Sequence, residues 1–332
     1  MSAFNNVEDG IIKCKENCIK CAIKNNFPIE EKLNVIIVIS NPCMYSRRIV
    51  LFKEFVKRIE LEEDVNLFIV EMIYNDGVKN QEFTVTSSTN PNHLQLTSSI
   101  PLWHKENMIN LGVKYLLPQD YRAFAWIDAD VEFESPTWAM DTLKILNGCK
   151  DVVQLWSHSV DMARDETNLN IFNSFCYSYS KNKKYNMHGK DCWHPGFAWA
   201  MTRKAYERLG GLYDKAVVGS GDIVMALSFI NNVHLWQQST YNADYNNSMI
   251  DYQKKALNIR LGYVPGVIRH YYHGSKINRK YVERKDILIT NEFSPSIHIT
   301  YDENGVRIPT SECPQQFITD IMKYFIERKE DD

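Results

Sequence analysis

The chain has 332 residues, of which 44% are hydrophobic and 24% charged, and its formal net charge is −3. This composition excludes wholesale disorder and a strongly basic surface for nucleic acid, so we expect no nucleic-acid partner. The longest apolar stretches, such as NVIIVIS at 34–40, are far shorter than the roughly 20 residues of a membrane-spanning helix, and residues 1–25 lack a signal-peptide apolar region. We therefore expect a cytoplasmic protein without a transmembrane segment.

The first half of the chain alternates strand and helix patterns. The first thirty residues are polar and predict an N-terminal helix or tail before a linker at Pro28. The β-branched run at 34–40 is typical of a buried parallel strand, and helical spacing follows it. In chain order we predict a strand at 34–40, a helix at 46–60, a strand at 66–74, a helix at 104–116 and a strand from residue 123. Strand–helix–strand repeats indicate a doubly wound α/β sheet with helices on both faces.

The second half is less regular. Residues 158–192 are rich in Asn, Lys and Tyr without a clear period, and predict a long loop on the binding side. Around this loop we predict a helix at 136–146, a strand at 151–157, a strand and helix within 196–211, and helices at 248–260 and 315–328. The expected organisation is an N-terminal extension (1–32), an α/β first half (33–157), a second half of the same domain (158–290) and a C-terminal extension (291–332).

Two carboxylates interrupt an apolar run in AFAWIDADVEF at 123–133. If the strand continues, Asp128 and Asp130 point to the same side, roughly 6–7 Å apart. Burying two like charges without compensation is costly, so the pair requires water or a cation. Ligands of open α/β sheets bind beyond the carboxyl ends of the strands, where Mg²⁺ or Mn²⁺ could join these carboxylates to a diphosphate. The pattern therefore predicts a divalent-cation site.

Three segments in order resemble the metal-dependent nucleotide-sugar glycosyltransferases of the GT-A fold, which carry a DxD motif after a buried strand. They are PLWHKENMINLGVKYLLPQDYRAFAWIDADVEFESPTWAMDTLKIL (101–146), WHPGFAWAMTRKAYERLGGLYDKAVVGSGDIVMAL (193–227) and IRHYYHGSKINRKYVERKDIL (268–288). The resemblance covers roughly residues 33–290. It implies a GT-A fold, which has a Rossmann-like, mostly parallel sheet, and a Mn²⁺ or Mg²⁺ cofactor. It also implies a nucleotide-sugar donor, with UDP sugars favoured, bound by the first half (33–157), and a carbohydrate or glycoconjugate acceptor bound by the second half (158–290).

The resemblance also implies roles for individual residues. Asp128 would contact the donor ribose or the metal, and Asp130 would ligate the metal directly. His273 would be the third ligand, with His270 as the competing choice. The residues implied at the nucleotide are Glu71, Lys105 and Asn110.

The transfer reaction needs a base for the acceptor hydroxyl, and Asp222 in VVGSGDIVMALSF is our candidate. Two glycines precede it at a predicted helix start, where an Asp could also serve only as a helix cap. Attack from the opposite face would invert the anomeric centre. Aromatic side chains could stack on sugar faces, and we expect acceptor contacts from Trp156, Trp193 and His194, with Tyr213 as a further candidate.

Two other functions are left open by the sequence. Cys14, Cys18 and Cys21 have the C-x3-C-x2-C spacing of radical-SAM iron–sulfur enzymes, although the same spacing describes a labile zinc site or one packed face of a helix. A non-catalytic module that binds nucleotide sugars would also use this fold. The identity of the sugar, base and acceptor, and the oligomeric state, have no signature in the sequence.

Overall fold

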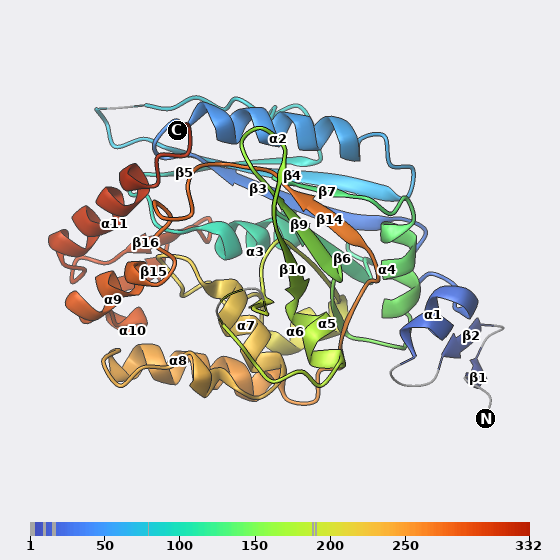
Figure 1. Cartoon of the computed structure of the whole chain (residues 1–332). Coiled ribbons are helices and arrows are strands. Elements are labelled where there is room, and N and C mark those ends of the chain that lie inside the picture. Colours follow the sequence, from blue (N-terminus) through green and yellow to red (C-terminus); the bar gives the residue numbers. More distant parts are fainter. Residues whose placement is uncertain (1–3, 9–10, 15–17, 79, 188, 190) are drawn as a thin grey trace.

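The computed structural model describes residues 4–8, 11–14, 18–78, 80–187, 189 and 191–332, and its centre is a seven-stranded sheet (Figure 1). The strand order is β13-β8-β12-β6-β3-β4-β5, and every pair is parallel except the two made by β12. The strands are β3 (Leu33–Ser40), β4 (Val65–Tyr74), β5 (His93–Ser98), β6 (Ala123–Ile127), β8 (Val152–Gln154), β12 (Ala198–Thr202) and β13 (Leu261–Tyr263).

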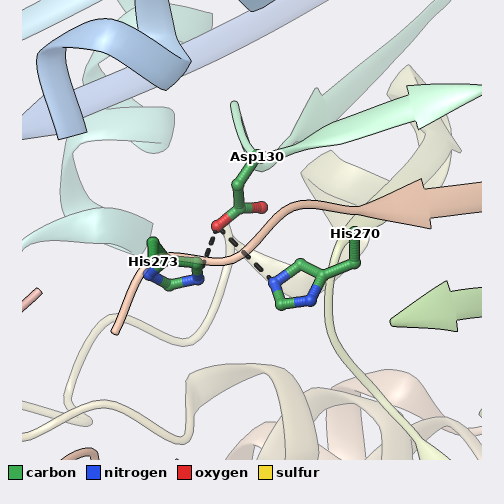
Figure 2. Close-up of side chains that lie close together, drawn as sticks. All are labelled: Asp130, His270 and His273. Carbon is green, nitrogen blue, oxygen red and sulfur yellow. Dashed lines mark ion pairs between the residues drawn. The ribbon is translucent and has the colours of Figure 1, made fainter. Parts of the chain in front are cut away.

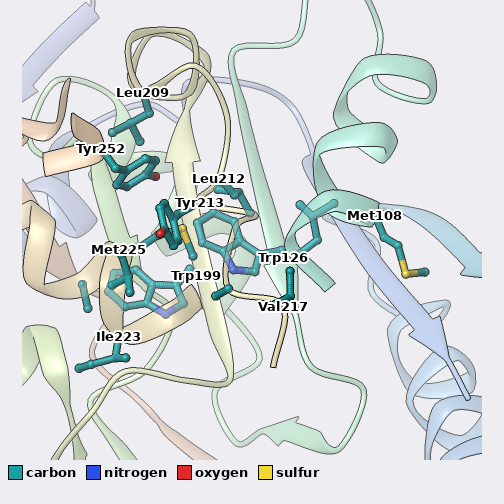
Figure 3. Packing of buried hydrophobic residues seen from close by; sticks show 14 of the residues in the cluster. Met108, Trp126, Trp199, Leu209, Leu212, Tyr213, Val217, Ile223, Met225 and Tyr252 are labelled. Atoms are coloured by element: carbon teal, nitrogen blue, oxygen red, sulfur yellow. The ribbon is translucent and has the colours of Figure 1, made fainter. Parts of the chain in front are cut away.

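Helices cover both faces of this sheet because its strands are apolar on both sides. In β3, Val35 and Ile37 pack into one core, whereas Ile36 packs into the other. The first core receives α2 (Ser46–Ile59) and α4 (Trp138–Leu146). The second receives α3 (Lys105–Tyr115), α6 (Arg203–Leu209), α7 (Gly221–Phe229) and α8 (Ala243–Ala256); part of it is drawn in Figure 3. The predicted doubly wound, mostly parallel α/β fold is confirmed.

The absence of a side chain at Gly112 sets the distance between α3 and the sheet. A Cβ atom there would lie 3.0 Å from methyl carbons of both Ile36 and Val70. Contacts that short are tighter than ordinary packing, so a larger residue would push α3 outward. The N-terminal end of α3, which carries Lys105 and Glu106, is thereby held against the carboxyl ends of the strands.

A second sheet, in the order β11-β10-β9-β14-β7, lies beside the first. Its strands show that the predicted long loop at 158–192 was wrong. Residues 158–192 are not a long loop, because they contain two strands of this sheet and a helix. Their strands bury polar side chains, among them Ser159 and Asp161, so the apolar period that marks a strand is missing. The elements are β7 (Val131–Phe133), β9 (His158–Met162), β10 (Asn168–Ser174), α5 (Phe175–Ser180), β11 (Trp193–His194) and β14 (Val267–His270).

Two short antiparallel strands and a short helix, rather than one helix or a tail, make up the described part of the N-terminal extension. They lie at the opposite end of the molecule from α11 (Figure 1). None of the described helices combines the length and apolar character needed to cross a bilayer. The remaining elements are β1 (Phe4–Glu8), β2 (Ile11–Cys14), α1 (Ile19–Asn25), η1 (Val233–Leu235), η2 (Glu283–Lys285), α9 (Asp286–Thr290), α10 (Pro295–His298), β15 (Ile299–Tyr301), β16 (Arg307–Pro309) and α11 (Gln315–Glu327).

The residues after α11 fasten the C-terminal end of the described chain to the start of α2. The Asp331 carboxylate accepts hydrogen bonds from the backbone N–H groups of Ser46 (3.0 Å) and Arg47 (2.7 Å). These are unpaired N–H groups of a helix N-terminus, where a negative charge is favoured. The buried Glu330 carboxylate receives two hydrogen bonds from Arg48, at 2.5 and 2.7 Å. The C-terminal residues therefore pack against the first turn of α2.

Candidate active site

A cavity of about 700 Å³ opens at the carboxyl ends of β3 and β6. The end of β3, the turn between β6 and β7, and residues 193–197 line one part of it. Segments from 270 to 285, the end of α11 and the starts of α3 and α7 line further parts. Its position is the one at which open α/β sheets bind ligands.

Asp130, His270 and His273 form a group of potential metal ligands in this cavity (Figure 2). Asp130 Oδ2 lies 2.8 Å from His273 Nε2 and 3.8 Å from His270 Nε2. Ligand atoms on one ion with bonds of about 2.1 Å lie roughly 3–4 Å apart, so this spacing fits a shared cation. The structure thus brings together both histidines between which the sequence could not choose.

A buried carboxylate orients His270 within this group. Asp161 Oδ1 accepts a hydrogen bond from His270 Nδ1 at 2.7 Å, and Lys276 pairs with the other oxygen of Asp161 at 2.5 Å. With the proton on Nδ1, the Nε2 lone pair of His270 faces Asp130. Carboxylate–histidine pairs of this kind commonly support metal ligands from behind.

The protonation states of the group suit a cation. Burial would raise the pKa of the Asp130 carboxyl, but His273, His270 and Arg279 outweigh it and hold that pKa well below its usual range. Burial lowers the pKa of His273 to about 4, which leaves a neutral imidazole at pH 7. Asp130 Oδ1 is buried without a hydrogen-bond partner among the described residues. One carboxylate and two imidazoles are ligands that Mn²⁺ accepts, and Zn²⁺ would also fit.

Asp128 faces a different partner from Asp130. The strand β6 ends at Ile127, so the two carboxylates occupy a turn rather than one strand face, and the alternation expected from the sequence does not apply. Asp128 forms an ion pair with Lys105 at the start of α3. Burial raises the pKa of Asp128, and Lys105 opposes this effect. Both residues line the cavity, but Asp128 is not within the group of three potential ligands.

Asp222 lines the cavity in the first turn of α7. Its Oδ1 accepts a hydrogen bond from the Ile223 N–H at 2.9 Å. Ser220, which precedes the helix, has a φ of +77°, and Phe197, which also lines the cavity, has a φ of +81°. Such conformations cost a non-glycine residue about 1–3 kcal/mol and often occur at functional sites. The carboxylate is accessible to a ligand and helps to shape the helix start.

Glu106 is a cavity residue that sequence reasoning missed. It is buried next to the α7 N-terminus, where a Cβ atom on Gly221 would lie 2.5 Å from its Oε1. Burial raises the pKa of Glu106 to about 7, although the neighbouring Lys105 lowers it. Asp161 was missed as well, because no sequence motif relates it to His270.

The other predicted site residues divide into two groups. Trp193 and His194 line the cavity, and the indole Nε1 of Trp193 has no hydrogen-bond partner among the described residues. His194 is stacked on Phe197, and burial lowers its pKa to about 3. Trp156 and Tyr213 are instead buried core residues outside the cavity lining.

Glu71 and Asn110 are also not brought to the cavity. The Glu71 carboxylate receives hydrogen bonds from residues 84–86, at 2.6–3.1 Å, and holds that loop against β4. Asn110 bonds to both backbone groups of Leu212 and to the Tyr206 hydroxyl. Both side chains stabilise loops, which differs from the predicted contacts with the nucleotide.

The cysteine motif lies on the N-terminal hairpin and helix. Cys14 ends β2, whereas Cys18 precedes α1 and Cys21 lies within it, so a single helical face does not carry all three. The side chain of Cys14 lies outside the described residues. Neither Cys18 nor Cys21 lines the cavity.

No protein-family model matches the sequence, and no curated protein matches it. Among solved structures, the chain is similar to the mannosyltransferase PcManGT from Pyrobaculum calidifontis in complex with GDP-Man and Mn²⁺, with 11% identity and a TM-score of 0.40 over 93% of this chain and 75% of that one. It is also similar to a mutant Drosophila beta-1,4-galactosyltransferase 7 in complex with manganese, UDP-Gal and xylobiose, with 9% identity and a TM-score of 0.41 over 87% and 98%. Both are glycosyltransferases, but likeness this remote carries no argument about substrate or residues.

Proposed function

We propose that this protein is a metal-dependent glycosyltransferase that moves a sugar from a nucleoside-diphosphate sugar, with UDP sugars favoured, to a carbohydrate or glycoconjugate acceptor. The observation that carries the proposal is the group of Asp130, His270 and His273 in a large cavity at the carboxyl ends of the sheet. Lys105 and Asp222 lie in the same cavity. A cation site, a lysine and a free carboxylate are the parts that such a transfer requires.

Each residue has a role in this reaction. Asp130, His270 and His273 would hold Mn²⁺ or Mg²⁺, and Asp161 would orient His270. When bound, the ion supplies Lewis-acid stabilisation of the charge that develops on the leaving diphosphate, which is worth several kcal/mol. Lys105 keeps Asp128 in place at the donor side of the cavity.

Asp222 is the proposed base for the acceptor hydroxyl. A positioned carboxylate that removes this proton as the new bond forms contributes typically 10²–10⁴-fold to the rate. Attack on the face opposite the diphosphate inverts the anomeric centre. Trp193 and His194 offer an indole N–H and an imidazole ring to the sugars.

The direct test is a panel of UDP-glucose, UDP-galactose and their N-acetyl forms, with Mn²⁺ and with excess chelator. We expect donor binding by thermal shift and slow donor hydrolysis in Mn²⁺, with both lost in chelator. Binding without turnover on any acceptor would indicate a nucleotide-sugar-binding module instead. Unchanged affinity in chelator would contradict the metal site.

A further inference from the structure

Three arginines from the C-terminal part of the chain line the cavity and are almost completely buried. The exposed fractions of Arg279, Arg284 and Arg328 are 5%, 9% and 4%. Arg328 has a carboxylate partner, because its Nε lies 2.6 Å from Glu330 Oε1. Across the part of the chain that the structure describes, no carboxylate forms an ion pair with Arg279 or Arg284.

All hydrogen-bond partners of these two guanidinium groups are neutral. Arg279 donates to the Tyr281 hydroxyl (2.7 Å) and to the His273 carbonyl (3.3 Å). Arg284 donates to Ser220 Oγ at 2.8 Å and to the Tyr324 hydroxyl at 3.2 Å. The Nε atom of each is buried without a partner among the described residues. Burying a charge in this way is unfavourable unless an anion balances it.

The two guanidinium groups lie beside the same aromatic ring of the cavity lining. Their Cζ atoms are 6.0 and 5.3 Å from the centroid of the Tyr281 ring. Burial would raise the pKa of the Tyr324 hydroxyl, yet Arg328 and Arg284 lower it. This part of the cavity therefore carries positive charge that no directly contacting carboxylate of the described residues balances, although Asp130 is near enough for Arg279 to lower its pKa.

Arg279 and Arg284 contact residues beside the proposed metal site, which would hold the donor, and beside Asp222, the proposed base for the acceptor. Arg279 binds the backbone of His273, beside the metal ligands, and Arg284 binds Ser220, two residues before Asp222. If the diphosphate is held at the metal, an anion between these arginines belongs to a sugar near the reacting centre. This step rests on the proposed function.

We propose that Arg279 and Arg284 form a subsite for an acidic sugar and recognise a carboxylate or phosphate substituent that is separate from the donor diphosphate. Planar guanidinium groups suit both anions, because each can donate two parallel hydrogen bonds. The acidic sugar is carried either by the donor or by the acceptor.

The test compares charged and neutral probes by calorimetry. The donor arm compares the binding of UDP-glucuronate with that of UDP-glucose in the presence of Mn²⁺. The acceptor arm compares the binding of glucuronate and of glucose 6-phosphate with that of glucose, each with and without UDP. We expect the charged probe of at least one arm to bind ~10-fold or more tightly than its neutral counterpart, since hydrogen bonds to ionised groups are strong. Arg284→Gln and Arg279→Gln should remove the preference, and Arg284→Lys should retain part of it.

Several results would overturn the proposal. Equal binding of charged and neutral probes in both arms is one, and an undiminished preference in both Gln variants is another. A ~10-fold loss of UDP affinity in Arg284→Gln would assign the arginines to the diphosphate. The matched control is Arg203→Gln, which removes a partly exposed arginine of α6 outside the cavity lining; an equal loss of preference there would show a general charge effect. Melting temperatures confirm that each variant is folded.

The proposed glycosyltransferase function can be refuted independently of the acidic-sugar subsite. If UDP and UDP-glucose show no Mn²⁺-dependent binding, the glycosyltransferase proposal is wrong. The titrations of glucuronate and glucose 6-phosphate without nucleotide still decide whether the two arginines bind an acidic sugar.

Discussion

Replacing Glu106 with glutamine should stabilise the protein more at high pH than at low pH. Burial raises the pKa of this carboxyl from 4.5 to about 7 in the folded protein. Below pH 4.5 both folded and unfolded chains hold the proton. As the pH rises from 4.5 to 7, the unfolded chain releases it first, so the free energy of unfolding falls, and the loss levels off above pH 7.

The magnitude follows from the difference between the two pKa values. A difference of 7 − 4.5, about 2.5 units, corresponds to a loss of roughly 3 kcal/mol at 1.36 kcal/mol per unit. Glutamine has nearly the same shape and does not ionise. The stability of Glu106→Gln relative to the original protein should therefore increase by up to about 3 kcal/mol between pH 4.5 and pH 8.

Urea unfolding at pH 4.5, 6, 7 and 8, without added metal, measures this change. The matched control is Glu303→Gln, at an exposed carboxylate outside the cavity lining, whose effect should vary little with pH. If the difference in unfolding free energy between Glu106→Gln and the original protein is the same at every pH, the carboxyl of Glu106 titrates normally and the reasoning from burial is wrong.

Three further predictions concern the proposed reaction. Asp130→Asn should abolish Mn²⁺ binding in calorimetry while leaving the metal-free melting temperature close to that of the original protein; unchanged Mn²⁺ affinity would exclude Asp130 as a ligand. Asp161→Asn should weaken Mn²⁺ binding about 10–100-fold by releasing His270, and full affinity would show that His270 needs no orientation or is not a ligand. Asp222→Asn should keep donor affinity and lose at least ~100-fold in transfer to an acceptor, with inverted product by NMR; a near-normal rate would leave Asp222 as a helix cap, and a retained configuration would contradict inversion.

The central sheet could be predicted because its signals are local. The apolar run of β3 and the helical spacing of α2 depend only on neighbouring residues, and their observed bounds, 33–40 and 46–59, agree closely with the predicted ones. Local patterns gave the position of Asp130 at the end of a strand as well. They could not show that the chain turns there and enters a second sheet, because that depends on pairing between β7 and β14 across more than 130 residues.

The differences between the predicted and the observed surroundings of these side chains have one physical cause. Glu71 and Asn110 have the right chemistry for a ligand, but backbone groups of distant loops take up their hydrogen-bonding atoms. Arg279 and Arg284 look like ordinary residues of a basic segment, and only the tertiary packing shows that they are buried without a carboxylate. The residue type indicates which side chains can bind a ligand. Whether the folded protein already supplies hydrogen-bond or ion-pair partners to a side chain decides which of them remain free to do so.

The contact between the C-terminal residues and the start of α2 has a consequence for the timing of synthesis. The cavity is lined by residues from Val38 to Arg328, and its edge is secured when Glu330 meets Arg48 and Asp331 meets the start of α2. A nascent chain that has left the ribosome only as far as α10 can pair β3 with β4 and β6, but it lacks this wall. Ligand binding in this cavity should therefore appear late, after residues 328–331 have emerged.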